Sequence, residues 1–140
     1  MIQKAEIHIE SEQTTDGVCD RIEQRFFGEF RRSERCFFLR FTQYDEEEKE
    51  STVNRLFFYP TGRVVFIREG GIESRMELLP GHCTPCTHQT RYGTFHFLVE
   101  TDAVAFEEKE GKAEIFFSYS LRHDNRSLLH NRMKLKIKEV

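Results

Sequence analysis

Alternation of apolar and polar residues dominates this sequence, and this period of two constrains the fold more than any other feature. Every second residue in the range Ala113–Leu121 is apolar, and Met133, Leu135 and Ile137 alternate with lysines. The same pattern begins near the N-terminus at Ala5. Successive side chains of a strand point to opposite faces, so the pattern predicts strands that bury one face.

Turn signals divide the chain into about ten such strands. The pairs at 16–17 and 70–71 are hairpin signals, and the charged run 45–50 is expected at an exposed tip. Gly28 lies inside a long strand and predicts a bulge or a sharp coil, as a closing sheet needs. Pro85 predicts a short, irregular edge strand, because proline cannot donate to a ladder. The strands are expected at 4–10, 18–30, 36–44, 52–59, 63–69, 72–79, 84–89, 95–106, 113–121 and from 133 onward.

Short connections between so many strands predict one antiparallel meander. Such a sheet must close into a barrel or split into two packed sheets, and sequential hairpins favour the up-and-down barrel. The composition agrees, because the chain has 14 Phe and four Tyr, and aromatic residues favour strands. We therefore expect one all-β domain over residues 1–140, with eight to ten strands around a core or a small cavity.

The charge balance excludes some partners. There are 21 basic and 24 acidic residues, giving a net charge of −3, and this disfavours binding to the phosphates of nucleic acid. The 18 aromatic residues are better explained as core than as a base-stacking surface. No stretch is apolar enough for a signal peptide or a membrane span, so we expect a cytoplasmic protein with reduced thiols and no membrane contact.

Several short segments, taken in order, resemble one family. They are Val64–Gly70, Ser74–Met76, Thr90–Gly93, Thr101, Phe117–Leu121 and Asn131–Leu135. Together they resemble the DUF1934 or YwiB-like family over about residues 2–139, a bacterial family without an assigned activity. The resemblance implies a calycin-type, lipocalin-like β-barrel and supplies no catalytic residues. This chain differs in having Arg91 where the family's turn usually has proline, and in its Cys-x-x-Cys at Cys83 and Cys86.

The Cys-x-x-Cys is the most conspicuous local motif. A redox motif of this kind normally precedes a helix, and no helix pattern follows here. A zinc site needs four tetrahedral ligands, whereas Cys83, Cys86 and His88 supply three, and no second pair lies at a matching spacing. Reduced thiols in a polar hairpin are the simpler interpretation, so we expect no metal and no cofactor.

Arg68 is the best candidate for a binding residue. It shares a strand phase with Val64 and Phe66, so it is predicted to point into the barrel and to bind a carboxylate or phosphate there. In the alternative, Val65 and Ile67 face inward and Arg68 lies at the surface or pairs with a nearby glutamate, since both faces of this strand are apolar. Tyr119 lies in the apolar phase of its own strand, where its hydroxyl would orient the same ligand. Further candidates at the mouth of the barrel are Tyr92, Ser74 and Met76.

No enzyme signature is present, neither a nucleophile elbow, nor a phosphate-binding loop, nor a zinc-protease motif. The sequence therefore predicts a non-enzymatic barrel that binds a small apolar or anionic ligand in a mostly apolar cavity. The alternative is a barrel filled solid by phenylalanine that works as a protein-interaction module or homodimer. A third possibility, hydrolase or lyase chemistry at the mouth, has no motif to support it.

Overall fold

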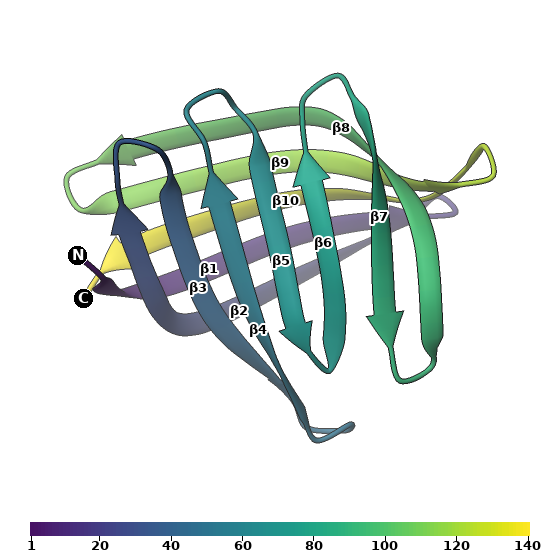
Figure 1. Ribbon diagram of the computed structural model, residues 1–140, viewed down its shortest axis with the longest axis horizontal. Helices are drawn as coiled ribbons and strands as arrows, with labels where there is room; N and C mark the ends of the chain where they lie inside the picture. The colour runs from purple at the N-terminus through teal and green to yellow at the C-terminus, as the bar shows by residue number, and fades with distance from the viewer.

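The computed structural model describes residues 1–140 and contains ten strands and no helix. Each strand pairs antiparallel with its neighbours in sequence, and β1 pairs with β10, so the sheet closes into a barrel (Figure 1). The predicted all-β meander and its strand number are confirmed. No helix is present that is long and apolar enough to cross a membrane. The strands are β1 Gln3–Thr15, β2 Val18–Arg32, β3 Phe37–Asp45, β4 Glu50–Phe58, β5 Val64–Gly70, β6 Ile72–Leu78, β7 Cys83–Thr90, β8 Gly93–Lys109, β9 Lys112–His123 and β10 Arg126–Glu139.

Several strands are longer than the alternation predicted. β1 continues through Ser11–Thr15, where all five polar residues pair with β2 and the first four also pair with β10. β10 likewise begins at Arg126 rather than near residue 133. The β1 extension carries polar side chains on both faces, whereas the β10 extension contains the adjacent residues Leu128 and Leu129 among polar ones. Neither extension alternates apolar with polar residues, so neither has a period-two signal for sequence analysis to detect.

β7 is not the edge strand that Pro85 predicted. It pairs with β8 along its whole length, and with β6 over Ile72–Arg75 only. Pro85 lies beyond the segment paired with β6 and faces Leu98 of β8. The sheet tolerates the proline because its missing N–H falls where the β6 ladder has already ended.

Gly28 marks the point where β2 reaches β3, and no register shift interrupts β2 there. A Cβ at this position would lie 2.3 Å from the carbonyl oxygen of Arg40 and 2.8 Å from Cδ1 of Ile7. The glycine is therefore required by the close approach of two backbones and does not form a bulge.

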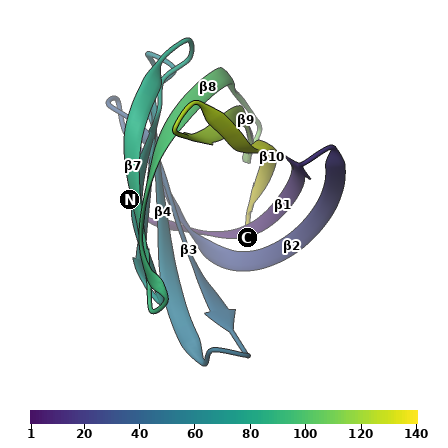
Figure 2. The same ribbon diagram turned by 90° about the vertical axis from the view of Figure 1, so that its right-hand side faces the viewer.

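The two ends of the barrel differ. Both termini lie at one end of the barrel (Figure 1). Large, fully buried side chains form a continuous core at this end. At the opposite end the hairpins diverge: the β1–β2 and β9–β10 turns point to the right in Figure 1, whereas the β3–β4, β5–β6 and β7–β8 turns point down. Figure 2 shows the same separation from the side, with β3, β4 and β7 opposite β1, β2 and β10. The core residues at the packed end include Phe30, Leu39, Leu56, Leu78, Ile115 and Phe117.

The divergence leaves a gap in the barrel wall between β2 and β3. These strands pair only from Gly28 to Arg32 on β2 and from Phe37 to Phe41 on β3. Residues 18–27 of β2 pair with β1 alone, and residues 42–45 of β3 pair with β4 alone. Between β2 and β3 the barrel wall is thus closed toward the packed end and open toward the other end.

Candidate functional site

A cavity of about 450 Å³ lies inside the open half of the barrel. Twenty residues line it, and 11 of them are hydrophobic. This size and polarity are typical of sites for small organic molecules. The apolar lining includes Ile9, Phe41, Phe66, Phe97, Leu121 and Met133, and the polar lining includes Gln43, Asn54, Arg68, Ser74, His88 and Asn131.

Arg68 points into this cavity from β5, in the orientation predicted from Val64 and Phe66. Its Nε donates to Oδ1 of Asn54 at 3.0 Å, and Nη2 donates to Oε1 of Gln43 at 3.1 Å. Both acceptors are neutral amides, and no carboxylate forms an ion pair with the guanidinium. Burial lowers the pKa of Arg68 from its ordinary value. The cavity therefore holds a partly desolvated positive charge whose protein partners carry no opposite charge.

Tyr119 lies deeper in the same cavity and is 7% exposed. Its hydroxyl oxygen accepts a hydrogen bond from Nδ2 of Asn131 at 3.0 Å. Burial is the main cause that raises the pKa of Tyr119, and Asn131 and Arg68 oppose this shift. The phenol is thus neutral at ordinary pH. The other amide atom of Asn131, Oδ1, is buried without a hydrogen-bond partner.

Ser74 and Met76, the candidates from β6, line the cavity. Ser74 faces Arg68 on one side and His88 on the other in the strand register. The pKa of His88 is lowered, first by burial and then by the positive charge of Arg68. Around Arg68 the cavity therefore presents one fixed cation and one imidazole that is neutral at pH 7.

Tyr92 does not line the cavity, contrary to the prediction. It lies in the β7–β8 turn, is 73% exposed, and donates a hydrogen bond from its hydroxyl to Oε1 of Glu48 at 2.5 Å. Arg91 beside it forms an ion pair with the same carboxylate. These contacts tie the β7–β8 turn to the β3–β4 turn and draw Tyr92 beyond the end of the barrel. Arg91 thus contributes an ionic contact between the two turns.

The two cysteines of the Cys-x-x-Cys point to opposite sides of β7. Cys86 is buried and lines the cavity, whereas Cys83 is exposed. Three residues apart on a strand, the two side chains cannot bind one ion together or form a disulfide. Burial raises the pKa of the Cys86 thiol, which keeps it protonated.

Sequence analysis missed the amides of Asn54 and Gln43 that hold Arg68, and it missed Asn131 and His88 as cavity residues. Asn54 lies in one phase with Thr52, Leu56 and Phe58, all buried. A polar residue in the buried phase of a strand is the signal that identifies it, because a buried amide needs partners. Asn131 lies in the same strand phase as Met133, and His88 lies in the same phase as Cys86. Each is therefore a polar residue in the inward phase of its strand.

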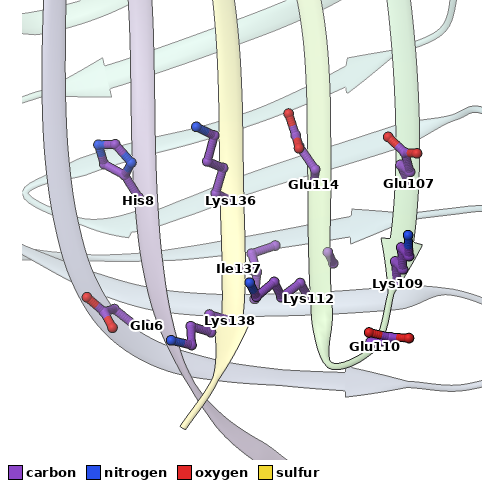
Figure 3. Close-up of a pocket in the computed structure, with 11 residues that line it drawn as sticks. Glu6, His8, Glu107, Lys109, Glu110, Lys112, Glu114, Lys136, Ile137 and Lys138 are labelled. Atoms are coloured by element: carbon purple, nitrogen blue, oxygen red, sulfur yellow. The ribbon is translucent and has the colours of Figure 1, made fainter.

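A larger hollow of about 730 Å³ lies on the outer face of β8, β9, β10 and β1 (Figure 3). Its charged lining alternates in sign, with Lys136 and Lys138 beside Glu6 and Glu114 (Figure 3). Several of these side chains already pair with acids, as Lys136 does with Glu10 at 3.6 Å. The cavity inside the barrel is the candidate site, because it combines a largely apolar wall with a cation that has no charged partner.

Comparison with known proteins gives a family and a fold. The family model described as "Domain of unknown function (DUF1934)" matches residues 7–135. The structure is similar to the crystal structure of the ywiB protein from Bacillus subtilis, with a TM-score of 0.84 and 17% sequence identity. The match covers 99% of this chain and 93% of that chain. No curated protein matches the sequence.

Proposed function

The chain belongs to the DUF1934 family of unknown function, and we propose that it is a non-enzymatic barrel that binds one small amphipathic monoanion. The observation that carries this proposal is Arg68, a partly buried cation inside a largely apolar cavity with only neutral protein partners. Charges removed from water in proteins are normally paired, because an unpaired one is costly. A ligand carboxylate would supply the missing charge.

The guanidinium is well presented for such a ligand. It has five N–H donors in a planar fork, and the contacts to Asn54 and Gln43 use one each at Nε and Nη2. The remaining donors suit the two oxygens of a carboxylate or a phosphate. The apolar lining of the same cavity, which includes Phe41 and Phe97, fits a hydrocarbon body.

The mouth of the cavity favours a ligand with a single negative charge. A second hollow of about 490 Å³ adjoins the cavity and shares Gln24, Gln43 and Arg68 with it. Its rim carries the acidic residues Asp45, Glu46, Glu47 and Glu50. The four carboxylates at this rim repel polyanions such as nucleotides, whereas a monocarboxylate bears the least of this repulsion. We therefore favour a monocarboxylate over a phosphate ester.

Matched probes test the proposal directly. Dodecanoate and dodecanol have the same chain length and differ in the head group, so calorimetric titration with each separates the charge from the apolar contact. We expect one molecule of dodecanoate per chain, bound at least about tenfold more tightly than dodecanol. Equal affinities would contradict a role for the charge, and the absence of binding by either probe would contradict the binding barrel.

The alternative of a solid barrel applies to one half of the molecule only. The packed end is filled by residues such as Phe30 and Phe117, while the open half holds the cavity. Phenylalanine thus serves both as core and as cavity wall. This division favours the ligand-binding proposal over a purely structural barrel.

Binding of a carboxylate should tighten as the pH falls from about 7.5 to 5.5. In the free protein, burial and Arg68 hold the pKa of His88 below its ordinary value. A bound anion offsets the positive charge of Arg68 and raises the pKa of His88, so binding takes up protons. A single linked proton strengthens binding by at most about tenfold per pH unit. Titration of dodecanoate at three pH values measures this effect.

His88→Gln is the control for the pH effect. It should bind dodecanoate with little change over this pH range, and an unchanged slope would show that another group is responsible. The lowered pKa of His88 in the free protein also makes the stability of the fold depend on pH, and this stability falls as the pH falls. The unfolded chain, with a histidine pKa of about 6.5, binds the proton more readily, so the contribution of His88 to stability is full above that pH and declines below it.

A further inference from the structure

We propose that a second copy of this chain pairs with β2 along its free edge, residues 18–27, to form a two-fold symmetric dimer. The proposal concerns the gap between β2 and β3 and does not depend on the ligand. An unpaired strand edge presents backbone N–H and C=O groups that can extend the sheet with a strand from another chain.

The free edge is long. β2 pairs with β1 along its whole length, yet β3 leaves it at Gly28. Residues 18–27 therefore have a partner on one side only, and the β1–β2 turn points away from the β3–β4 turn (Figure 1). Most natural barrels close their edges completely, and this edge stays open over two-thirds of a strand of 15 residues.

The side chains of this segment also lack cover. Every residue from Val18 to Arg25 is exposed, although the strand alternates and one of its faces is directed inward. Val18 is 61% exposed and Ile22 is 42% exposed, and both belong to the inward phase. By contrast, the inward residues of β9 are buried from Ala113 to Tyr119. A strand placed beside β2 would cover Val18 and Ile22.

The sequence of the edge is complementary to itself. An antiparallel pairing with the two-fold axis at Ile22 places Ile22 opposite Ile22 and Val18 opposite Phe26. On the other face it places Arg21 of each copy opposite Glu23 of the other. Directly opposed residues of opposite charge or of apolar character stabilise antiparallel pairs. The same residue faces inward in both copies, so the two sheets continue into one another.

Neighbouring registers are less favourable. An axis at Arg21 opposes two arginines, and an axis at Glu23 opposes two glutamates, and like charges in direct opposition destabilise a pair. An axis at Gln24 pairs a shorter segment and sets Arg21 against Phe27. Within the chain Arg21 contacts Glu12 at 2.9 Å, but this ion pair is exposed, and such pairs contribute little. Arg21 is therefore available to a second copy.

The dimer would also complete the wall of the cavity. Ile22 and Gln24 line the cavity beside the gap. The strand of the second copy would lie against this side and reduce the access of water to the cavity. The open lateral seam of the barrel thus becomes an interface between two copies.

Charge reversal with rescue tests both the edge and its register. Analytical ultracentrifugation should show a concentration-dependent dimer for the unaltered protein. In a dimer of Arg21→Glu, a glutamate at 21 faces Glu23 at both symmetric positions, and in a dimer of Glu23→Arg, an arginine at 23 faces Arg21 at both. The dissociation constant of each variant alone should therefore rise by about tenfold or more. An equimolar mixture of the two variants restores both attractive pairs and should form a heterodimer. Arg75→Glu, at an exposed position of β6, is the matched control and should dimerise like the unaltered protein.

Three results would overturn the proposal: a monomer at every concentration, a dimer that neither single variant weakens, or variants that remain monomeric when mixed. Circular dichroism of each variant confirms that it is folded, and the mixture rescues only folded chains. Titration of the monomeric Arg21→Glu variant with dodecanoate keeps the two proposals separate. If the unaltered protein does not dimerise but the Arg21→Glu variant binds dodecanoate, the dimer is rejected and the proposed ligand site stands.

Discussion

Replacing Arg68 by methionine should weaken the binding of dodecanoate by about a hundredfold and leave the binding of dodecanol nearly unchanged. Methionine replaces the aliphatic stem of arginine and carries no charge, so it keeps the apolar packing of the stem without offering a donor to the carboxylate. Truncation of one member of a partly buried, hydrogen-bonded charge pair is among the most damaging changes to a binding site. Calorimetric titration of both probes against the variant and the unaltered protein measures the difference.

The stability of the Arg68→Met variant should change by no more than about 1 kcal/mol, because two effects oppose each other. Removal of an unpaired cation from the cavity is favourable, whereas Asn54 and Gln43 each lose a donor to their amide oxygen. Arg75→Met, which alters an exposed arginine on the neighbouring strand, is the control and should leave both affinities unchanged. If Arg68→Met binds dodecanoate as the unaltered protein does, the arginine does not hold the ligand's charge.

Much of the fold follows from the period of two, but the direction of Arg68 did not. In β5 the consecutive residues Val64, Val65 and Phe66 are all buried, since the outer face of this strand packs as well as the inner one. A strand with two apolar faces has no unique phase, and the sequence left Arg68 with two possible orientations. Its partners settle the orientation, because Asn54 opposes it in β4 and lies in a buried phase.

The split between β2 and β3 was also beyond sequence analysis. The segment 18–27 alternates as a fully paired strand does. The hydrophobic pattern predicts which face of the sheet a side chain lies on, but it does not predict how many neighbouring strands pair with the segment. Gly28 was recognised as unusual, but its cause is a contact with the backbone of Arg40, far along the chain. Tyr92 failed as a cavity residue for a similar reason, since its position depends on Glu48 in another turn.

Substitution of Gly28 by alanine should destabilise the protein by about 3 kcal/mol, a large effect for one methyl group. The added Cβ would lie 2.3 Å from the carbonyl oxygen of Arg40, and a backbone atom cannot move aside as a flexible side chain does. The strands β2 and β3 must then separate at the first of their few paired residues, where the barrel closes. The packed core around Phe30 and Leu39 would lose part of its cover at this seam.

Chemical denaturation of the Gly28→Ala variant measures this loss, and Gly81→Ala provides the control. Gly81 has no atom within 4 Å of an added Cβ, although its φ of +79° makes alanine strained there. That strain costs about 1 kcal/mol, so Gly81→Ala should be the milder change. If the two variants are equally stable, the contact with Arg40 does not constrain the seam. A larger loss for Gly28→Ala means that the five-residue pairing of β2 with β3, beyond which the wall is open, is what closes the barrel.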